Sequence, residues 1–507
     1  MITILEKLCI AALILALAPL SRNGYSSVAA EDANDLISDD TATCIDCHMS
    51  VTPGIVSDWQ RSRHATATVA RARTLPPQER RVSADVVPTH LATVSVGCAE
   101  CHGQLTDGHS DAFEHNGYAI HVVVTPRDCA VCHPAEVEQY AQNLMSYAYP
   151  NLAENALYMQ LVESGSGLQR LHGSTLETQP PSDTTYAEGC FYCHGTRVTV
   201  TGSETRDTEL GTMEFPRLNG WPSQGVGRIN PDGSRGCCSS CHTRHRFSIA
   251  MARKPATCAQ CHKGPDVPAY KVYGVSKHGN LYAAEHAEWD FTAVPWIPGE
   301  HFSAPTCATC HVSLLVTGDG EIAAARTHRM NDRSAWRLFG LPYAHPHPRS
   351  ANTTIIRNRA GLPLPTELTG EPASEFLIDE VEMTARSGRM QRICGTCHST
   401  SWIAPLFART AHTIAETNAM TLTATGILQQ AWEHGLASGP AQGGSPFDEN
   451  IEKMWVAQWL FYANSVRFAS AMGGADYGSF ANGRWNLSEN LRRMHDWLAI
   501  RTDAGSD

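Results

Sequence analysis

The chain has 507 residues, a formal net charge of −12 at pH 7 and a pI near 6.0. This acidic balance excludes nucleic acid as an expected partner, because binding to nucleic acid depends on a basic surface. The sequence also contains 18 cysteines, and their spacing is the feature that decides the class of protein.

Residues 1–30 predict a secretory signal peptide. Lys7 precedes an apolar run over residues 8–20, and the small residues Val28, Ala29 and Ala30 form a cleavage site. We therefore expect cleavage near Ala30 and a mature protein in the periplasm. The alternative is an uncleaved membrane anchor, although the apolar run is shorter than the roughly 20 residues that a spanning helix needs.

Eight copies of the motif Cys-x-x-Cys-His follow between residues 31 and 400. Two thiols at this spacing can bind the vinyl groups of one porphyrin, while the adjacent imidazole binds its iron. The motifs therefore predict eight c-type haems. The attachment residues would be Cys44, Cys47, Cys98, Cys101, Cys129, Cys132, Cys190, Cys193, Cys238, Cys241, Cys258, Cys261, Cys307, Cys310, Cys394 and Cys397. The proximal iron ligands would be His48, His102, His133, His194, His242, His262, His311 and His398.

Two other uses of these cysteines fit the pattern less well. Structural disulfides do not require a histidine after each second cysteine. Zinc sites would join the motifs in pairs and would leave the eight histidines unexplained. Only Cys9, within the expected signal peptide, and Cys237 lie outside the motifs.

The spacing of the motifs predicts closely packed haems. The motifs that begin at Cys98 and Cys129 are close in sequence, as are those that begin at Cys238 and Cys258, so their haems should be neighbours. We expect residues 31–400 to form the octahaem catalytic region. Glycine and proline predict irregular structure over residues 220–236 and 340–348.

The C-terminal region, residues 401–507, contains no further motif and predicts long helices. Apolar residues recur at helical spacing over residues 448–472, with Asp448 as the N-cap and Gly473 and Gly474 after the last turn. Residues 407–436 and 486–500 predict two more helices. We expect these helices to form a subunit interface, or to cap the haem-binding region.

The number of histidines bears on the reactivity of the haems. A haem with two histidine ligands transfers electrons, whereas a haem with one protein ligand can bind a substrate. The sequence has 24 histidines, so the motifs leave enough for second ligands. Met251 and Met330 are alternatives, although methionine more often fills a core. The candidate second ligands are His64, His121, His245, His278, His328, and one of His345 and His347.

Several segments are similar to those of the octahaem hydroxylamine oxidoreductase family. The resemblance covers most of the chain beyond the signal peptide and is carried by residues 225–281, 291–296, 304–314, 336–348 and 458–478. It implies a mainly α-helical fold with closely packed haems and little β-structure, and a homotrimer.

The resemblance also implies that the fourth haem, attached at Cys190 and Cys193, binds the substrate, with His194 as its proximal ligand. It suggests Asp232 and Tyr343 as catalytic residues above that haem. Gly233 follows Asp232 where the family has a histidine. Tyr343 could equally be a buried aromatic residue with a satisfied hydroxyl group.

The direction of the reaction depends on a tyrosine that oxidative members of the family attach to the substrate haem of a neighbouring subunit. Trp485 stands at the matching position here, and Tyr477 is the nearest tyrosine. Members without that tyrosine resemble reductases, so we expect reduction of hydroxylamine or nitrite to ammonium, with electrons from a periplasmic or quinol-linked cytochrome. The alternatives are oxidation of hydroxylamine, a non-catalytic electron-transfer protein, and a tetrathionate or sulfite reductase.

Overall fold

A computed structural model describes residues 36–208 and 211–504, so the expected signal peptide, with Cys9, lies outside the described residues. The described chain is mainly helical, and its sheets are two-stranded. This confirms the predicted fold class. Across the described ranges, no helix combines the length and the apolar character needed to cross a membrane.

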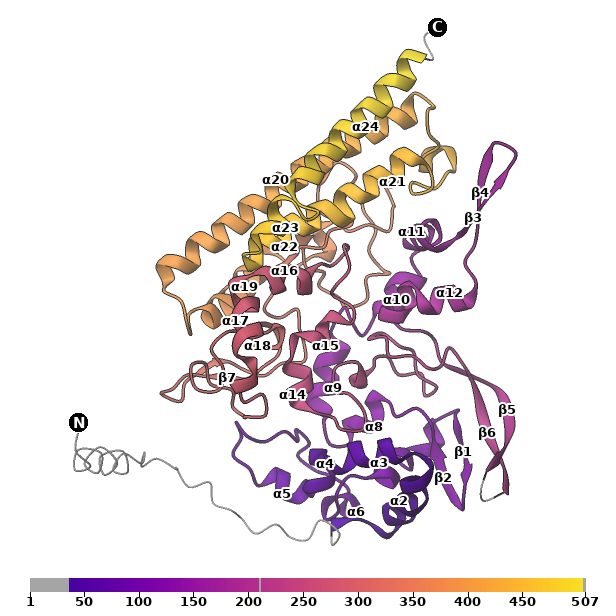
Figure 1. Ribbon diagram of the computed structural model, residues 1–507, viewed down its shortest axis with the longest axis vertical. Helices are drawn as coiled ribbons and strands as arrows, with labels where there is room; N and C mark the ends of the chain where they lie inside the picture. The colour runs from indigo at the N-terminus through magenta and orange to yellow at the C-terminus, as the bar shows by residue number, and fades with distance from the viewer. Residues whose placement is uncertain (1–35, 209–210, 505–507) are drawn as a thin grey trace, which may run out of the picture.

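Short helices dominate the first half of the chain, at the lower end and right side of Figure 1. They are α2 (Asp39–Val51), α3 (Pro53–Gln60), α4 (Arg63–Thr66), α5 (Val69–Arg73), α6 (Thr89–Ala92), α7 (Cys98–His102), η2 (Thr106–Gly108), α8 (Pro126–Ala130), α9 (Pro134–Ala141), α10 (Ala148–Ala153), α11 (Ala156–Ser166), α12 (Asp183–Glu188) and α13 (Cys190–His194).

Short helices also make up the middle of the chain. They are η3 (Cys238–Ser240), α14 (Ile249–Arg253), α15 (Pro255–Ala259), α16 (Ala269–Val275), α17 (Lys277–Glu285), η4 (His286–Glu288), α18 (Cys307–His311), η5 (Ser374–Phe376) and α19 (Glu380–Cys394).

The strands pair as antiparallel hairpins between these helices. Two hairpins, β3 with β4 and β5 with β6, project from one side of the molecule (Figure 1). The strands are β1 (Ala112–His115), β2 (Tyr118–His121), β3 (Leu168–His172), β4 (Thr175–Gln179), β5 (Thr199–Thr208), β6 (Gly211–Asn219), β7 (Leu315–Val316), β8 (Ile322–Ala324), β9 (Trp336–Arg337) and β10 (His345–Pro346).

The C-terminal region forms a layer of long helices across one end of the molecule (Figure 1). Its core packs Leu428 of α20 against Ile451 and Trp455 of α21 and Met494 of α24. The elements are α20 (Thr400–Glu433), η6 (Pro440–Gln442), α21 (Asn450–Val456), the π-helix η7 (Ala457–Ala463), α22 (Asn464–Met472), α23 (Ala475–Ser479) and α24 (Arg484–Ala504).

Two details of the predicted helices differ from the structure. The helix predicted from residue 407 begins at Thr400. The prediction of Asp448 as an N-cap is wrong, because Glu449 occupies that position and forms a capping box with Glu452. The predicted end is confirmed, since Gly473 adopts a left-handed conformation, with φ of 75°, after the last residue of α22.

The Cys-x-x-Cys-His motifs fold as helical turns, the first of them inside the longer helix α2. In four of them the amide of the histidine donates to the carbonyl of the first cysteine, as in His133 to Cys129 at 2.8 Å and His398 to Cys394 at 2.9 Å. A helical turn brings residues three and four positions apart to the same face. The local fold therefore presents both thiols and the imidazole of each motif on one side.

Candidate functional site

One large cavity, of about 2690 Å³, runs through the molecule. Six of the eight motifs line it with both thiols and the histidine, and Cys101 of the second motif lines it as well. The residues of these six motifs that line it are Cys129, Cys132, His133, Cys190, Cys193, His194, Cys238, Cys241, His242, Cys258, Cys261, His262, Cys307, Cys310, His311, Cys394, Cys397 and His398. A continuous cavity lined by thiols and imidazoles fits a row of covalently bound haems.

The thiols also show which motifs are neighbours. A hydrogen bond with the Cys98 thiol lowers the pKa of Cys44, so the first and second motifs touch. A hydrogen bond with the Cys129 thiol likewise lowers the pKa of Cys238, which joins the third and fifth motifs.

Two further thiol contacts involve the sixth motif. A hydrogen bond with the Cys261 thiol lowers the pKa of Cys193, and one with the Cys258 thiol lowers the pKa of Cys307. The sixth motif therefore contacts both the fourth and the seventh. Sequence spacing alone could not have shown the contact between the fourth and the sixth.

Five motif histidines have a histidine from outside the motifs about 6 Å away, and one of these pairs is His102 with His121, at 5.9 Å. The ring centres lie 6.2 Å apart for His48 and His115, and 6.3 Å apart for His64 and His133. The other two pairs are His242 with His328 at 6.3 Å and His278 with His398 at 6.0 Å. Two imidazoles that bind one metal ion from opposite sides, through bonds of about 2 Å, have ring centres roughly 6 Å apart. These separations therefore suit one iron between each pair.

The backbone holds the rings of several motif histidines in place. Nδ1 of His194 lies 3.0 Å from the carbonyl oxygen of Ala148, and Nδ1 of His311 lies 3.3 Å from that of Met330. A donor hydrogen bond from Nδ1 fixes the tautomer and leaves Nε2 as the ligand atom. Burial lowers the pKa of His194 and of His311, which favours the neutral imidazole that binds metal.

Five histidines from outside the motifs line the same cavity as the six motif histidines. Burial lowers the pKa of His64 and of His328 to about 4 and that of His345 to about 3, so each is neutral and can bind iron. The five are His64, His278, His328, His345 and His347. Among the described residues, six motif histidines and five histidines from outside the motifs line this cavity. One motif histidine is therefore left without a second histidine to bind the other face of its iron.

Most of the predicted second ligands lie opposite a motif histidine or in the cavity that the motifs line. His64, His278 and His328 each face a motif histidine, and His345 and His347 both line the cavity. His245 lies near His102, since burial and then the charge of His102 lower the pKa of His245 to about 4.

His115 was not among the predicted second ligands, although it faces His48. It ends strand β1 at a tight hairpin, where Asn116 and Gly117 have φ of 52° and 87°. The Asn-Gly pair is the sequence signal that could have placed His115 at a strand end.

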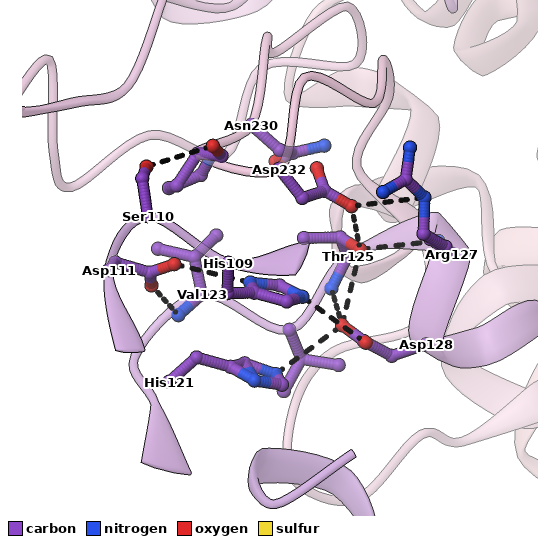
Figure 2. Close-up of polar contacts among 12 residues, drawn as sticks. His109, Ser110, Asp111, His121, Val123, Thr125, Arg127, Asp128, Asn230 and Asp232 are labelled. Carbon is purple, nitrogen blue, oxygen red and sulfur yellow. Dashed lines mark hydrogen bonds and ion pairs between the residues drawn. The ribbon is translucent and has the colours of Figure 1, made fainter. Parts of the chain in front are cut away.

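His121 lies beside His102, with the ring centres 5.9 Å apart. Its carbonyl oxygen is 2.7 Å from Nδ1 of His102, and its own ring stacks on His109, with ring centres 3.7 Å apart (Figure 2). His121 as a second ligand stays a prediction, and His245 is the other candidate near His102.

The structure does not bring the three predicted catalytic residues together, since only His194 lines the cavity. Asp232 accepts a hydrogen bond from the hydroxyl group of Thr125 at 2.9 Å, beside the second motif. Tyr343 is 1% exposed, and its hydroxyl group donates to the carbonyl oxygen of Leu368 at 2.7 Å. Tyr343 therefore matches the alternative of a buried aromatic residue with a satisfied hydroxyl group.

Arg337 and Tyr158 are cavity residues that the sequence analysis did not single out. Strand β9 carries Arg337 directly opposite His345 of β10. Its positive charge adds to the effect of burial in lowering the pKa of His194. Burial raises the pKa of Tyr158 to about 12, and the charge of Arg337 opposes that rise. In the described chain, no carboxylate lies within ion-pair distance of Arg337.

Comparisons with known proteins agree with this geometry. Residues 231–332 match the family described as "Seven times multi-haem cytochrome CxxCH". A probable nitrite reductase-hydroxylamine oxidoreductase fusion protein of Kuenenia stuttgartiensis is 25% identical over 372 residues. That match covers 70% of this chain but only 34% of the relative, so the chain spans about a third of its length.

Two solved structures have the same fold. The reducing HAO-like protein complex Kustc0457/Kustc0458 of Kuenenia stuttgartiensis is 19% identical, with a TM-score of 0.59, over 92% of this chain and 86% of that chain. A structure described as a hypothetical multiheme protein is 39% identical, with a TM-score of 0.87, over 95% of this chain and 100% of that chain. The chain therefore belongs to the family of multihaem c-type cytochromes that are similar to hydroxylamine oxidoreductase.

Proposed function

We propose that this protein is an octahaem oxidoreductase that reduces hydroxylamine or nitrite to ammonium. The proposal rests on the number of histidines in the main cavity. Six motif histidines line it, but only five described histidines from outside the motifs are there to bind the opposite iron faces. One haem would then keep an open face, and an iron with one protein ligand can bind a small nitrogen compound and exchange electrons with it.

The open face is assigned to the fourth haem, whose proximal ligand would be His194. Three of the six motif histidines already face His64, His278 or His328. His345 and His347 remain for two of His194, His262 and His311. The resemblance to the octahaem family favours His194 as the histidine without an opposing ligand.

The contacts between motifs support an electron path to that haem. The thiol contacts join the fourth motif to the sixth and the sixth to the seventh, through Cys193, Cys261, Cys258 and Cys307. Burial, with a smaller contribution from the charge of Cys394, raises the pKa of Cys310 to about 12, so the eighth motif lies next to the seventh. The fourth haem would therefore lie at one end of a row that continues through the sixth and seventh haems to the eighth.

Arg337 and Tyr158 would shape the substrate end of the cavity. Arg337 would supply a positive charge for an anion, either a haem propionate or nitrite, because no described carboxylate neutralises it. Tyr158 would stay protonated at neutral pH, so its hydroxyl group can donate a hydrogen bond to a bound nitrogen species. These two residues replace Asp232 and Tyr343 in the proposed site.

Two observations support the reductive direction. Trp485 stands where oxidative members carry the cross-linking tyrosine. The names of two relatives include a nitrite reductase and a reducing complex. The alternative of a tetrathionate or sulfite reductase is less well supported, because all eight motifs end in histidine and the Lys-ligated haem typical of such reductases is missing.

The setting of the reaction is part of the proposal. The protein would lie in the periplasm after removal of residues 1–30 and would receive electrons from a quinol-linked cytochrome. Phe480 and Trp485 are 70% and 66% exposed in the single chain. A homotrimer would cover them, with the C-terminal helical region, residues 401–507, at the subunit interface.

The test is a steady-state assay of the purified haem protein with hydroxylamine and with nitrite. One set of assays uses a reduced viologen dye as electron donor, and the other uses an oxidising dye as acceptor. The proposal expects turnover with the donor and formation of ammonium. Faster turnover with the acceptor, together with a haem peptide cross-linked at Tyr477, would show hydroxylamine oxidation instead.

A further inference from the structure

Basic side chains dominate the lining of the main cavity, although the protein as a whole has a net charge of −12. Of the described residues that line the cavity, eleven are arginine or lysine and five are aspartate or glutamate. A protein with more acidic than basic residues therefore concentrates positive charge around this space, which favours anions within it.

Two of these arginines, Arg81 and Arg253, are anchored to one short segment of backbone. Arg81 donates from Nη2 to the carbonyl oxygen of Thr292 at 2.8 Å. Arg253 donates from Nη1 to the carbonyl oxygens of Phe291 at 2.9 Å and of Ala293 at 2.6 Å. Three consecutive carbonyl groups therefore hold both guanidinium groups at the cavity wall.

Neither arginine has a carboxylate partner within ion-pair distance in the described part of the chain. Asp290 is the acidic residue whose charge acts on both of them. Its Oδ1, however, accepts hydrogen bonds from the amide and the hydroxyl group of Thr292, at 2.7 and 2.6 Å. Arg253 is only 4% exposed, and a buried charge without a counter-charge is strongly unfavourable.

Neighbouring positive charges add to this cost. Burial, and then the charges of Arg63 and Arg326, lower the pKa of Arg81 to about 10. Burial, and then the charge of Arg81, lower the pKa of Arg253 to about 9. Both groups are still charged at neutral pH, so they repel each other, and an anion beside them would offset that repulsion.

Both guanidinium groups keep N–H donors for a ligand. Arg81 uses Nη2 and Arg253 uses Nη1 in the bonds to the backbone. The remaining nitrogens, which are Nε and Nη1 of Arg81 and Nε and Nη2 of Arg253, have no acceptor among the described residues. A guanidinium group can bind a carboxylate through two parallel N–H···O bonds.

The pair also lies close to haem-binding segments. The backbone of Arg81 forms a hydrogen bond with the ring of His133, the proximal histidine of the third motif. Helix α14, which carries Arg253, packs against α18 of the seventh motif. Arg253 is held further by Trp296, whose ring centre lies 4.5 Å from the guanidinium carbon. Two positioned cations therefore stand among groups that attach haem.

We propose that Arg81 and Arg253 bind the propionate carboxylates of a haem that is attached in the main cavity. The propionates lie on the edge of a porphyrin opposite to the thioether bonds, so they are the anions that six attached haems would bring to this basic lining. An arginine paired with a propionate offsets negative charge near the iron and so raises the reduction potential of that haem. This pairing requires attached haems, but it is independent of the proposed substrate and of the reaction direction.

The test is a spectroelectrochemical titration of the intact haem protein, in which the absorbance of the haems is recorded against the applied potential. Arg81→Gln should lower the midpoint potential of one haem by about 59 mV, which is a tenfold change in its ratio of reduced to oxidised form. Arg81→Lys keeps the charge but not the paired N–H groups, so it should lower the same midpoint by a smaller amount. Arg81 is the residue to change, because Arg253 is more deeply buried and its loss would endanger folding.

Arg170→Gln is the matched control, because Arg170 lies on the exposed strand β3. It should leave the titration curve as in wild type. The high-spin signal of the ferric protein, which tests the proposed function, should be the same in all variants. Titration curves of Arg81→Gln and Arg81→Lys that coincide with that of wild type would overturn the proposal, and Arg81→Lys alone decides if Arg81→Gln fails to attach its haems.

A second arm separates a haem carboxylate from a free anion. The titrations are repeated at low and high phosphate, with chloride holding the ionic strength constant. A haem propionate is part of the protein, so the wild-type midpoint potentials should not depend on phosphate. A phosphate-dependent shift in wild type that Arg81→Gln abolishes would show that the pair binds a free anion, which overturns the assignment to haem.

Discussion

His64 and His133 face each other with their ring centres 6.3 Å apart, although one follows the first haem motif and the other belongs to the third. Nδ1 of His64 is buried and has no hydrogen-bond partner. The side chain is therefore held by packing, in a position that suits an iron ligand. His242 and His328 face each other at the same separation of 6.3 Å. The pairing of a motif histidine with a histidine from a distant segment is therefore repeated in the fold.

Removal of His64 should open the third haem. We expect His64→Ala to convert one low-spin haem to high spin while the haem count stays unchanged, because the covalent attachment at Cys129 and Cys132 is intact. Electron paramagnetic resonance of the ferric protein measures the change. His172→Ala, on the exposed hairpin, should leave the spectrum as in wild type, and an unaltered spectrum for His64→Ala would refute its role as a ligand.

Arg337 should matter more for an anionic substrate than for a neutral one. We expect Arg337→Met to raise the KM for nitrite about tenfold, which corresponds to the roughly 1.4 kcal/mol of a modest charge interaction, and to change the KM for hydroxylamine less. Steady-state kinetics with both substrates provides the measurement. Arg206→Met, on the exposed hairpin of β5, is the control. Equal effects on both substrates would argue against contact with nitrite.

Tyr343 should contribute to stability and not to turnover. Its hydroxyl group bonds Leu368 and, at 3.0 Å, Thr425 of helix α20. Loss of the hydroxyl group in Tyr343→Phe should cost about 1 kcal/mol of unfolding free energy and leave kcat within twofold of wild type. Thermal unfolding and the dye assay test the two parts. A drop in kcat by a factor of one hundred would restore the catalytic role that the family resemblance suggested.

Glu452 should make stability depend on pH near neutrality. Its side chain is buried and accepts from Nε1 of Trp432 at 2.9 Å, and burial raises its pKa from 4.5 to about 7. Because the folded-state pKa lies above the unfolded one, the charged form opposes folding above pH 7, and stability rises as the pH falls from 7 towards 4.5.

The matched variant for this effect is Glu452→Gln. Between pH 8 and pH 5.5 the wild type should gain about 2 kcal/mol relative to the variant. Denaturant titration at the two pH values measures the difference. A constant difference would mean that the carboxyl group titrates normally in the folded protein.

The sequence was most informative where chemistry is local. Each haem motif is a helical turn, so the relative positions of its two thiols and one imidazole follow from spacing alone. Second ligands such as His64 and His328 could be proposed because they lie near motifs in the sequence. The motif histidine that each one faces could not be predicted, because the two belong to segments that only the tertiary fold brings together.

Asp232 shows why the rest could not be predicted. It lies close to a haem motif in sequence, yet its hydrogen bond with Thr125 holds the side chain outside the main cavity. The β3–β4 hairpin was also missed, because its residues are exposed on both faces and lack an apolar alternation that marks a strand.

The central claim is that the protein carries eight haems of which one, at His194, keeps an open iron face. The most direct test is quantitative electron paramagnetic resonance of the ferric protein, with haem counted by mass spectrometry, before and after addition of cyanide. The account predicts eight haems, one high-spin iron for each chain, and conversion of that signal alone by cyanide. Eight low-spin irons that do not respond to cyanide would contradict it and would leave an electron-transfer protein without a substrate site.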